Sequence, residues 1–100
     1  MDIRLSDVVR ATAGRDKDKL FFVVGMEDGM VFLADGKGRR LEAPKRKKLK
    51  HVRLEARRDC RAAVKLQSGA KVTNSELRRA LAEFSAESGE EKGGMEFGER

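Results

Sequence analysis

The stretch LFFVVGMEDGMVFLA, residues 20–34, carries the strongest structural signal in the chain. Two apolar runs, Leu20–Met26 and Met30–Ala34, flank the pair Asp28-Gly29. This pattern is typical of a β-hairpin with a type I′ turn, because both central residues of that turn need positive φ. Neither run alternates between apolar and polar residues. The sequence therefore predicts a hairpin that is covered on both faces.

Shorter strand candidates lie before and after this hairpin. Asp7–Ala11 is rich in β-branched residues, and a polar turn, Gly14–Lys19, separates it from the hairpin. After the hairpin we expect a strand at Arg39–Ala43, which Pro44 ends because proline has no amide hydrogen to donate to a ladder. A last strand is expected at Leu49–Leu54. Five short strands with glycine-rich turns in about fifty residues suit a small barrel.

The second half of the chain has helical periodicity. Thr73–Glu76 has the form of a capping box. Apolar residues follow it at positions i, i+3, i+4 and i+7: Leu77, Ala80, Leu81 and Phe84. This spacing predicts a helix over residues 74–86, whose apolar stripe covers either the outer face of the 20–34 hairpin or a partner protein. A shorter helix that ends at Gly69 is predicted within residues 55–70.

Length and composition indicate one domain without a membrane span. The chain has 100 residues, of which 39% are hydrophobic and 40% are charged. No stretch approaches the ~20 apolar residues of a transmembrane helix, and the first residues do not resemble a signal peptide. The single cysteine, Cys60, excludes an internal disulfide framework and a cysteine-based zinc site. We therefore expect a cytoplasmic protein with no membrane partner.

Basic residues are concentrated in the middle of the chain. The whole sequence carries a net charge of +6, yet residues 39–53 alone contain eight basic residues and one acidic residue, a net +7. Residues 1–38 carry −1, and residues 83–100 carry −4. This distribution favours a polyanion-binding face on a folded body, with a merely solvated charged surface as the alternative.

The order of these segments resembles a known family. Residues 8–19 read VVRATAGRDKDK and precede the first apolar run, and they resemble the KOW motif of several large-subunit ribosomal proteins and of NusG-type transcription elongation factors. With the hairpin, Arg39-Arg40 and the run at 45–50 included, the chain looks most like the KOW-containing bacterial RNA-binding proteins. That group is similar in turn to a large-subunit ribosomal protein family of archaea and eukaryotes. The segment Lys71–Leu77 also resembles the C-terminal part of the bacterial group.

The resemblance covers about residues 4–54 and implies an SH3-like barrel that binds ribosomal or other structured RNA. Lys19 takes the position of the motif's lysine, and Asp18 stands where many members have glycine. Aspartate tolerates left-handed backbone angles better than most residues, so we expect the turn to be kept. The expected organisation is mainly β with C-terminal α structure: a five-stranded SH3-like (KOW) barrel at 1–54, a helical extension at 55–87 and a disordered acidic tail at 88–100.

Ten basic side chains are predicted to contact RNA. They are Arg15, Lys17, Lys19, Arg39, Arg40, Lys45, Arg46, Lys47, Lys48 and Lys50. Arginine offers phosphate a planar fork of donors, and lysine offers a mobile charge. The chain has no Trp or Tyr, and every Phe except Phe97 lies in an apolar pattern. Stacking sites for bases are therefore expected to be scarce, which favours recognition of the backbone and shape of folded RNA.

A catalytic role is not indicated by the sequence. It shows no carboxylate pair, nucleophile–base set or metal-ligand cluster that would support an enzyme. His51 has no Cys, Asp or Glu near it at ligand spacing. We expect no cofactor, no metal and no small-molecule substrate. The alternative function is a protein-interaction module that docks on a ribosomal protein or RNA polymerase. Its docking surface would be either the hairpin face or the helical stripe formed by Leu77, Leu81 and Phe84.

Overall fold

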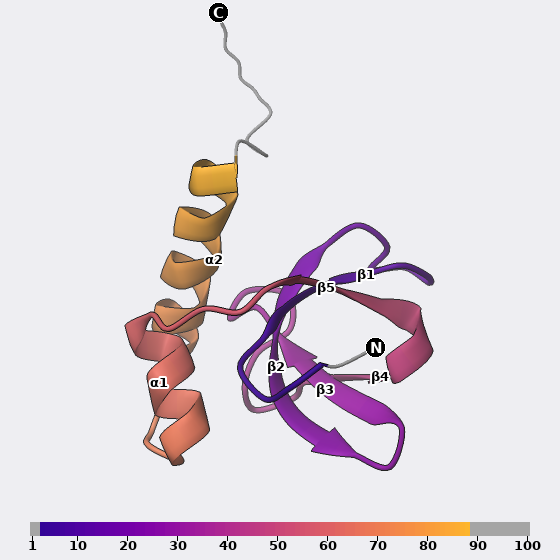
Figure 1. Ribbon diagram of the computed structural model, residues 1–100, viewed down its shortest axis with the longest axis horizontal. Coiled ribbons are helices and arrows are strands. Elements are labelled where there is room, and N and C mark those ends of the chain that lie inside the picture. Colours follow the sequence, from indigo (N-terminus) through magenta and orange to yellow (C-terminus); the bar gives the residue numbers. More distant parts are fainter. Residues whose placement is uncertain (1–2, 89–100) are drawn as a thin grey trace, which may run out of the picture.

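The computed structural model describes residues 3–88, which form a five-stranded antiparallel sheet with two helices on one side of it (Figure 1). The strands are β1 (Val8–Ala11), β2 (Leu20–Glu27), β3 (Met30–Ala34), β4 (Lys45–Lys48) and β5 (Val52–Ala56). They lie in the order β4-β3-β2-β1-β5, so β4 and β5 are the edges of an open sheet. Residues 89–100, which hold nearly all of the predicted acidic tail, lie outside the described residues.

The basic run itself forms the fourth strand, so the predicted strand at Arg39–Ala43 is wrong. The Asp35 carboxylate accepts hydrogen bonds from the backbone amides of Lys37 and Arg39. The Asp35 amide in turn donates to the Arg39 carbonyl at 2.8 Å. These local bonds fold the chain into a compact loop where an extended strand was expected. Pro44 precedes the strand instead of ending it.

The connection between β4 and β5 also differs from the prediction. Residues Leu49–His51 form the 3₁₀ turn η1, and β5 begins only at Val52 and continues to Ala56. The Leu49 amide donates to the Gly29 carbonyl at 2.8 Å, which ties η1 to the turn between β2 and β3. The last strand is therefore shifted along the chain relative to the predicted residues 49–54.

The β2–β3 hairpin is confirmed, but its turn is of a different type. Glu27 pairs with Met30 across the two residues of the turn. Gly29 has a φ of +72°, whereas Asp28 is not among the residues with positive φ. A type I′ turn requires positive φ at both positions. Positive φ at the second position alone is the pattern of a type II turn.

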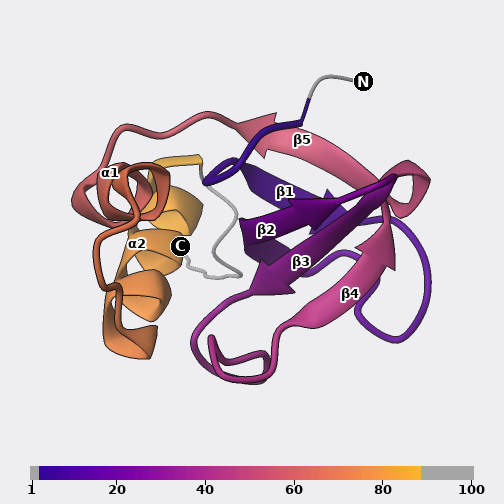
Figure 2. The same cartoon turned by 90° about the horizontal axis from the view of Figure 1, so that it is seen from below.

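Both faces of the sheet carry a buried apolar cluster, as the uninterrupted apolar runs predict. The inner cluster consists of Ile3, Val9, Ala11, Phe21, Val23, Val31, Leu33 and Val52. The outer cluster consists of Val8, Phe22, Ala34, Ala62, Leu77, Ala80, Leu81 and Phe84. Curvature of the sheet encloses the inner cluster (Figure 2). The helices cover the outer cluster.

The two helices are α1 (Arg61–Ser68) and α2 (Asn74–Ser88). The predicted capping box is present at the start of α2. The Glu76 amide donates to Thr73 Oγ1 at 3.2 Å, and the Thr73 amide donates to Glu76 Oε1 at 2.9 Å. α1 ends at Gly69, which has a φ of +79° and lets the chain leave the helix. α2 extends two residues beyond the predicted end.

The apolar stripe of α2 packs on the protein's own sheet. Leu77 is fully buried, and Leu81 and Phe84 are each 8% exposed. All three lie in the outer cluster with Phe22 of β2. The first of the two expected coverings, the outer face of the hairpin, is therefore confirmed. These side chains do not form an exposed docking stripe.

Leu77→Ala is expected to lower the free energy of unfolding by about 2–5 kcal/mol, because it opens a cavity between α2 and the sheet. Val64→Ala is the matched control, since Val64 is apolar, helical and 51% exposed. It should change stability by less than about 0.5 kcal/mol. Urea unfolding followed by circular dichroism measures both. Equal, small effects would show that α2 does not share a core with the sheet.

Candidate nucleic-acid interface

The polar segment between β1 and β2, residues 12–19, lies against β4 and η1 (Figure 2). We call this segment the β1–β2 loop. The Thr12 amide donates to the His51 carbonyl at 2.9 Å. The Lys47 ammonium donates to the Ala13 carbonyl at 2.7 Å. The two segments with predicted RNA-binding residues, which are separated in the sequence, are thus brought together at one edge of the sheet.

Lys47 faces inward from the basic run. It pairs with Val31 of the inner cluster, and only 8% of the residue is exposed. A Cβ added at Gly14 would lie 3.0 Å from Lys47 Nζ, so the loop backbone packs directly on the ammonium group. The structure therefore places this predicted RNA-binding residue beneath the β1–β2 loop, as a support for its backbone.

The loop also contains a buried carboxylate. Asp16 is 6% exposed, and its Oδ2 accepts a hydrogen bond from Arg39 Nη2 at 3.0 Å. Lys19 Nζ lies 3.9 Å from the other oxygen, while the Lys19 side chain stays largely exposed. A buried carboxylate without a partner is costly. Arg39, which was predicted to contact RNA, is therefore engaged in holding the loop.

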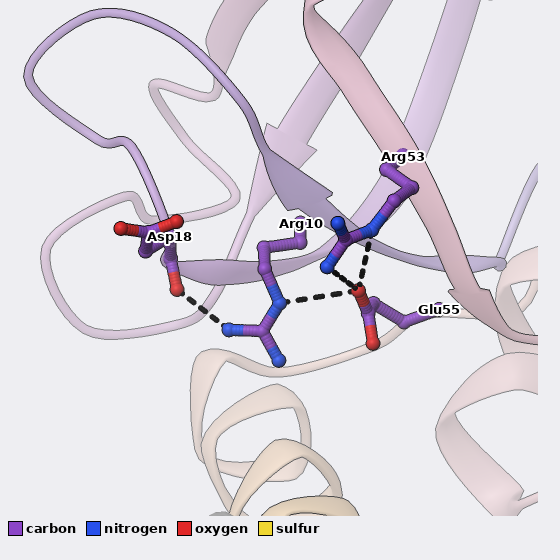
Figure 3. A network of polar contacts seen from close by, with 4 residues as sticks. All are labelled: Arg10, Asp18, Arg53 and Glu55. Atoms are coloured by element: carbon purple, nitrogen blue, oxygen red, sulfur yellow. Dashed lines mark hydrogen bonds and ion pairs between the residues drawn. The ribbon is translucent and has the colours of Figure 1, made fainter.

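A second polar network supports the loop from β5 (Figure 3). Glu55 Oε2 accepts hydrogen bonds from Arg10 Nε at 3.1 Å and from Arg53 Nη2 at 2.8 Å. Arg10 Nη1 donates to the Asp18 carbonyl at 2.7 Å. Burial raises the pKa of the Glu55 carboxyl, but the hydrogen bonds from Arg53 and Arg10 outweigh it and hold the pKa below its usual value.

Asp18 adopts a backbone conformation that glycine normally supplies. Its φ is +73°, and its amide donates to the Ala11 carbonyl at 2.8 Å. Aspartate enters this left-handed region at a lower cost than most residues with a side chain. The turn that we expect at Asp18 is therefore present. Its carbonyl is the group that Arg10 binds.

Six of the predicted basic residues have side chains without a hydrogen bond or ion pair to any residue in the described range 3–88. They are Arg15 and Lys17 in the β1–β2 loop, Lys45, Arg46 and Lys48 in β4, and Lys50 in η1. Together with Lys19 we call them the basic surface. All except Lys45, which is partly buried, are exposed. Arg40 is exposed in the loop before β4 and lies 3.9 Å from Glu42.

Strand alternation divides the basic run between two faces of the sheet. Arg46 pairs with Phe32 and Lys48 pairs with Met30, and these positions face outward. Lysine on an edge strand also prevents the edge from pairing with another sheet, because it would have to be desolvated. A phosphate-binding role and this protective role need the same exposed side chains, so a binding measurement must separate them.

The sequence did not single out three of the residues that shape this site. Arg10, Asp16 and Glu55 position the β1–β2 loop, and each lies between 2.7 and 3.1 Å from its hydrogen-bond partner. The available signals were a lone arginine within an apolar strand and an aspartate that alternates with basic residues in a loop. Both patterns also occur in ordinary solvated surfaces. Their partners follow only from the tertiary structure.

Comparison with protein-family models and with curated proteins finds no match for this chain. In residues 3–88 no helix is long and apolar enough to cross a membrane. The same residues contain no group of three His, Cys, Asp or Glu side chains that could hold a metal ion. The geometry of the basic surface is therefore the main basis for a functional proposal.

Glu55→Gln is expected to lower the free energy of unfolding by about 1 kcal/mol at about pH 7, because it removes the charge that Arg10 and Arg53 share. Folding lowers the pKa of Glu55. Its contribution is thus complete above the unfolded-state pKa of about 4.3 and is lost as the pH falls through the folded-state pKa. Urea unfolding of both proteins over a pH series should show their difference shrinking in acid. A constant difference would contradict this.

Lys47→Met is expected to lower the free energy of unfolding by about 1–3 kcal/mol, because the Ala13 carbonyl loses its donor. Lys48→Met is the matched control. It removes the same charge at the next position, where the side chain has no partner among the described residues, and should change stability by less than about 0.5 kcal/mol. Thermal and urea unfolding distinguish the two variants. Equal losses would mean that Lys47 does not support the loop.

Proposed function

We propose that this chain is a non-catalytic RNA-binding protein whose target is structured ribosomal RNA, in a role connected with the ribosome or translation. The observation that carries the proposal is the division of the basic residues into two sets. Arg10, Arg39 and Lys47 hold the β1–β2 loop through hydrogen bonds of 2.7–3.0 Å. The basic surface, by contrast, lies on the β1–β2 loop, β4 and η1, and all of its side chains except that of partly buried Lys45 are exposed to solvent.

A polyanion is the ligand that this charge arrangement favours. Cations gathered on one surface repel one another, and a nearby chain of phosphates relieves that repulsion. Two of the neighbouring carboxylates are already engaged: Asp16 is bound to Arg39, and Glu55 is shared by two arginines. Two others, Asp18 and Asp28, are exposed, and they are outnumbered by the seven cations of the basic surface. They therefore leave the positive charge of the basic surface largely uncompensated. RNA supplies phosphates at regular spacing.

The proposal includes the KOW assignment and an SH3-like barrel. The β1–β2 loop lies where the motif is expected, with Lys19 at its end and Asp18 in the left-handed conformation. The sheet order and its curvature support a small barrel, with η1 joining the two edge strands (Figure 2). The Lys47–Ala13 hydrogen bond supports it further, because it links β4 to the segment after β1 across the open side.

The protein-docking alternative finds only a partly exposed apolar surface in residues 3–88. Its stripe, Leu77, Leu81 and Phe84, is buried in the outer cluster. On the hairpin face, Met30 and Phe32 are only partly exposed, and the exposed cations Arg46 and Lys48 lie opposite them. RNA binding at the basic surface is therefore the function that we propose, and a ribosomal role implies a cytoplasmic location.

Replacing Arg46, Lys48 and Lys50 together by Gln is expected to weaken binding to ribosomal RNA and to make it less sensitive to salt. Each phosphate contact contributes about 0.7–0.9 to the slope of log affinity against log salt, so the triple variant should lose about 2–3 units of slope. Fluorescence anisotropy titrations with ribosomal RNA fragments at several salt concentrations measure this. None of the three side chains has a partner in residues 3–88, so the fold should be kept.

The control variant replaces three exposed basic residues on and beside the helices by Gln: Arg61, Lys71 and Arg79. It removes the same charge and leaves the basic surface intact, so it should bind RNA as the unmodified protein does. Equal weakening in both variants would mean that net charge, and not this surface, determines binding. Failure of the unmodified protein to bind ribosomal RNA would refute the proposed function.

A further inference from the structure

Part of the outward face of β3 is not covered by the helices. Ala34 lies in the outer cluster, but Phe32 and Met30 do not, although strand alternation places all three on the same face. Phe32 and Met30 are partly exposed. An apolar strip that the protein's own elements leave open on a small domain is a candidate contact surface.

The Phe32 ring lies over a position that has no side chain. Its cross-strand partner is Gly25, at the register shift in β2. A Cβ added at Gly25 would lie 3.2 Å from the ring carbon Cδ2 of Phe32. Glycine therefore lets the ring lie close to the sheet, in the arrangement by which an aromatic residue covers a strand glycine. Because Gly25 has no side chain, β2 places no side chain against the Phe32 ring at this position.

Two cations border this strip from β4. Arg46 is directly opposite Phe32, and Lys48 is directly opposite Met30. Both are exposed, and neither has a hydrogen bond or ion pair within the described residues. In residues 3–88 a cation–π contact joins Arg58 to the Phe84 ring, at 5.4 Å from the ring centroid. The Arg46 guanidinium makes no such contact with the Phe32 ring in the same residues.

The strip continues into a shallow groove between the β2–β3 turn and η1. The groove has a volume of about 680 Å³, and its lining residues are Asp28, Gly29, Met30, Lys48, Leu49 and Lys50. Met30 and Leu49 supply an apolar floor, while two ammonium groups and one carboxylate stand around it. Apolar side chains thus lie beside cations from Phe32 to the end of the groove.

We propose that Phe32, Met30 and the adjoining groove bind unpaired nucleotides of RNA. Bases stack on the Phe32 ring, and their phosphates contact the bordering cations: Arg46, Lys48 and Lys50. Unpaired bases have apolar faces attached to an anionic backbone, which is the combination that an apolar strip beside cations accommodates. The inference rests on the proposed function and specifies its target as RNA with a loop, bulge or free end. An uninterrupted duplex keeps its base faces stacked inside.

Titrations with two RNAs test this inference. One is a hairpin with the fluorescent adenine analogue 2-aminopurine in its loop, and the other is a fully paired duplex with the sequence of the stem. The unmodified protein should bind the hairpin more tightly and quench the 2-aminopurine fluorescence by stacking. Phe32→Leu keeps an apolar cover on Gly25 but removes the ring. It should abolish the quenching and weaken hairpin binding by about 5- to 150-fold, with duplex binding unchanged.

Met26→Leu is the matched control, because Met26 is 45% exposed on the same hairpin and pairs with inward-facing Val31. It should retain both the quenching and the preference for the hairpin. Phe32→Trp provides a test that does not depend on losing the ring. A larger ring at this position should deepen the quenching and tighten hairpin binding. Circular dichroism and thermal unfolding confirm that each variant is folded.

The outcomes separate this inference from the proposed function. Unchanged quenching and hairpin affinity in folded Phe32→Leu or Phe32→Trp would overturn stacking on Phe32, and binding of RNA through the basic surface would stand. Equal binding of hairpin and duplex by the unmodified protein, without quenching, would overturn it as well. Binding to neither RNA would instead refute the proposed function.

Discussion

Phe21 and Phe22 are neighbours in β2, and strand geometry directs their side chains to opposite faces of the sheet. Both are buried, so each face needs a cover of its own. The sheet curves around Phe21 to enclose the inner cluster, and α2 lies over Phe22 to enclose the outer one. Because Phe22 has to be covered, α2 packs against the sheet. This packing leaves the outward face of β3 open beyond the reach of α2.

The basic residues fall into two groups, because some of them are needed as hydrogen-bond donors to buried polar groups. The Asp16 carboxylate and the Ala13 carbonyl lie beside the sheet edge, and they are bound by Arg39 and Lys47. A buried acceptor without a donor would be costly, so these two cations are not interchangeable with their neighbours. Within residues 3–88, the remaining cations of β4 and η1 have no such partner. One chemical type of residue thus provides both the support of the loop and the proposed binding surface.

Local patterns predicted the elements whose signals are contained within a few residues. The Asp28-Gly29 hairpin and the capping box at Thr73–Glu76 are of this kind. The prediction of a strand at Arg39–Ala43 was wrong because the Asp35 carboxylate binds nearby backbone amides and closes a loop. Such side-chain-to-backbone hydrogen bonds compete with strand formation, and they cannot be predicted from hydrophobic periodicity. For the candidate site, the sequence located both basic segments but not the inward position of Lys47.

The sequence by itself determined that a two-faced hairpin, an amphipathic helix and a dense group of cations occur in this chain, because each depends on residue type and spacing. The tertiary structure decided which cations face solvent and which aromatic ring is partly exposed. Lys47 meets a carbonyl 34 residues away, and Phe32 lies over Gly25 through strand pairing. Four consecutive basic residues look alike in sequence. Only strand register and distant hydrogen-bond partners distinguish them.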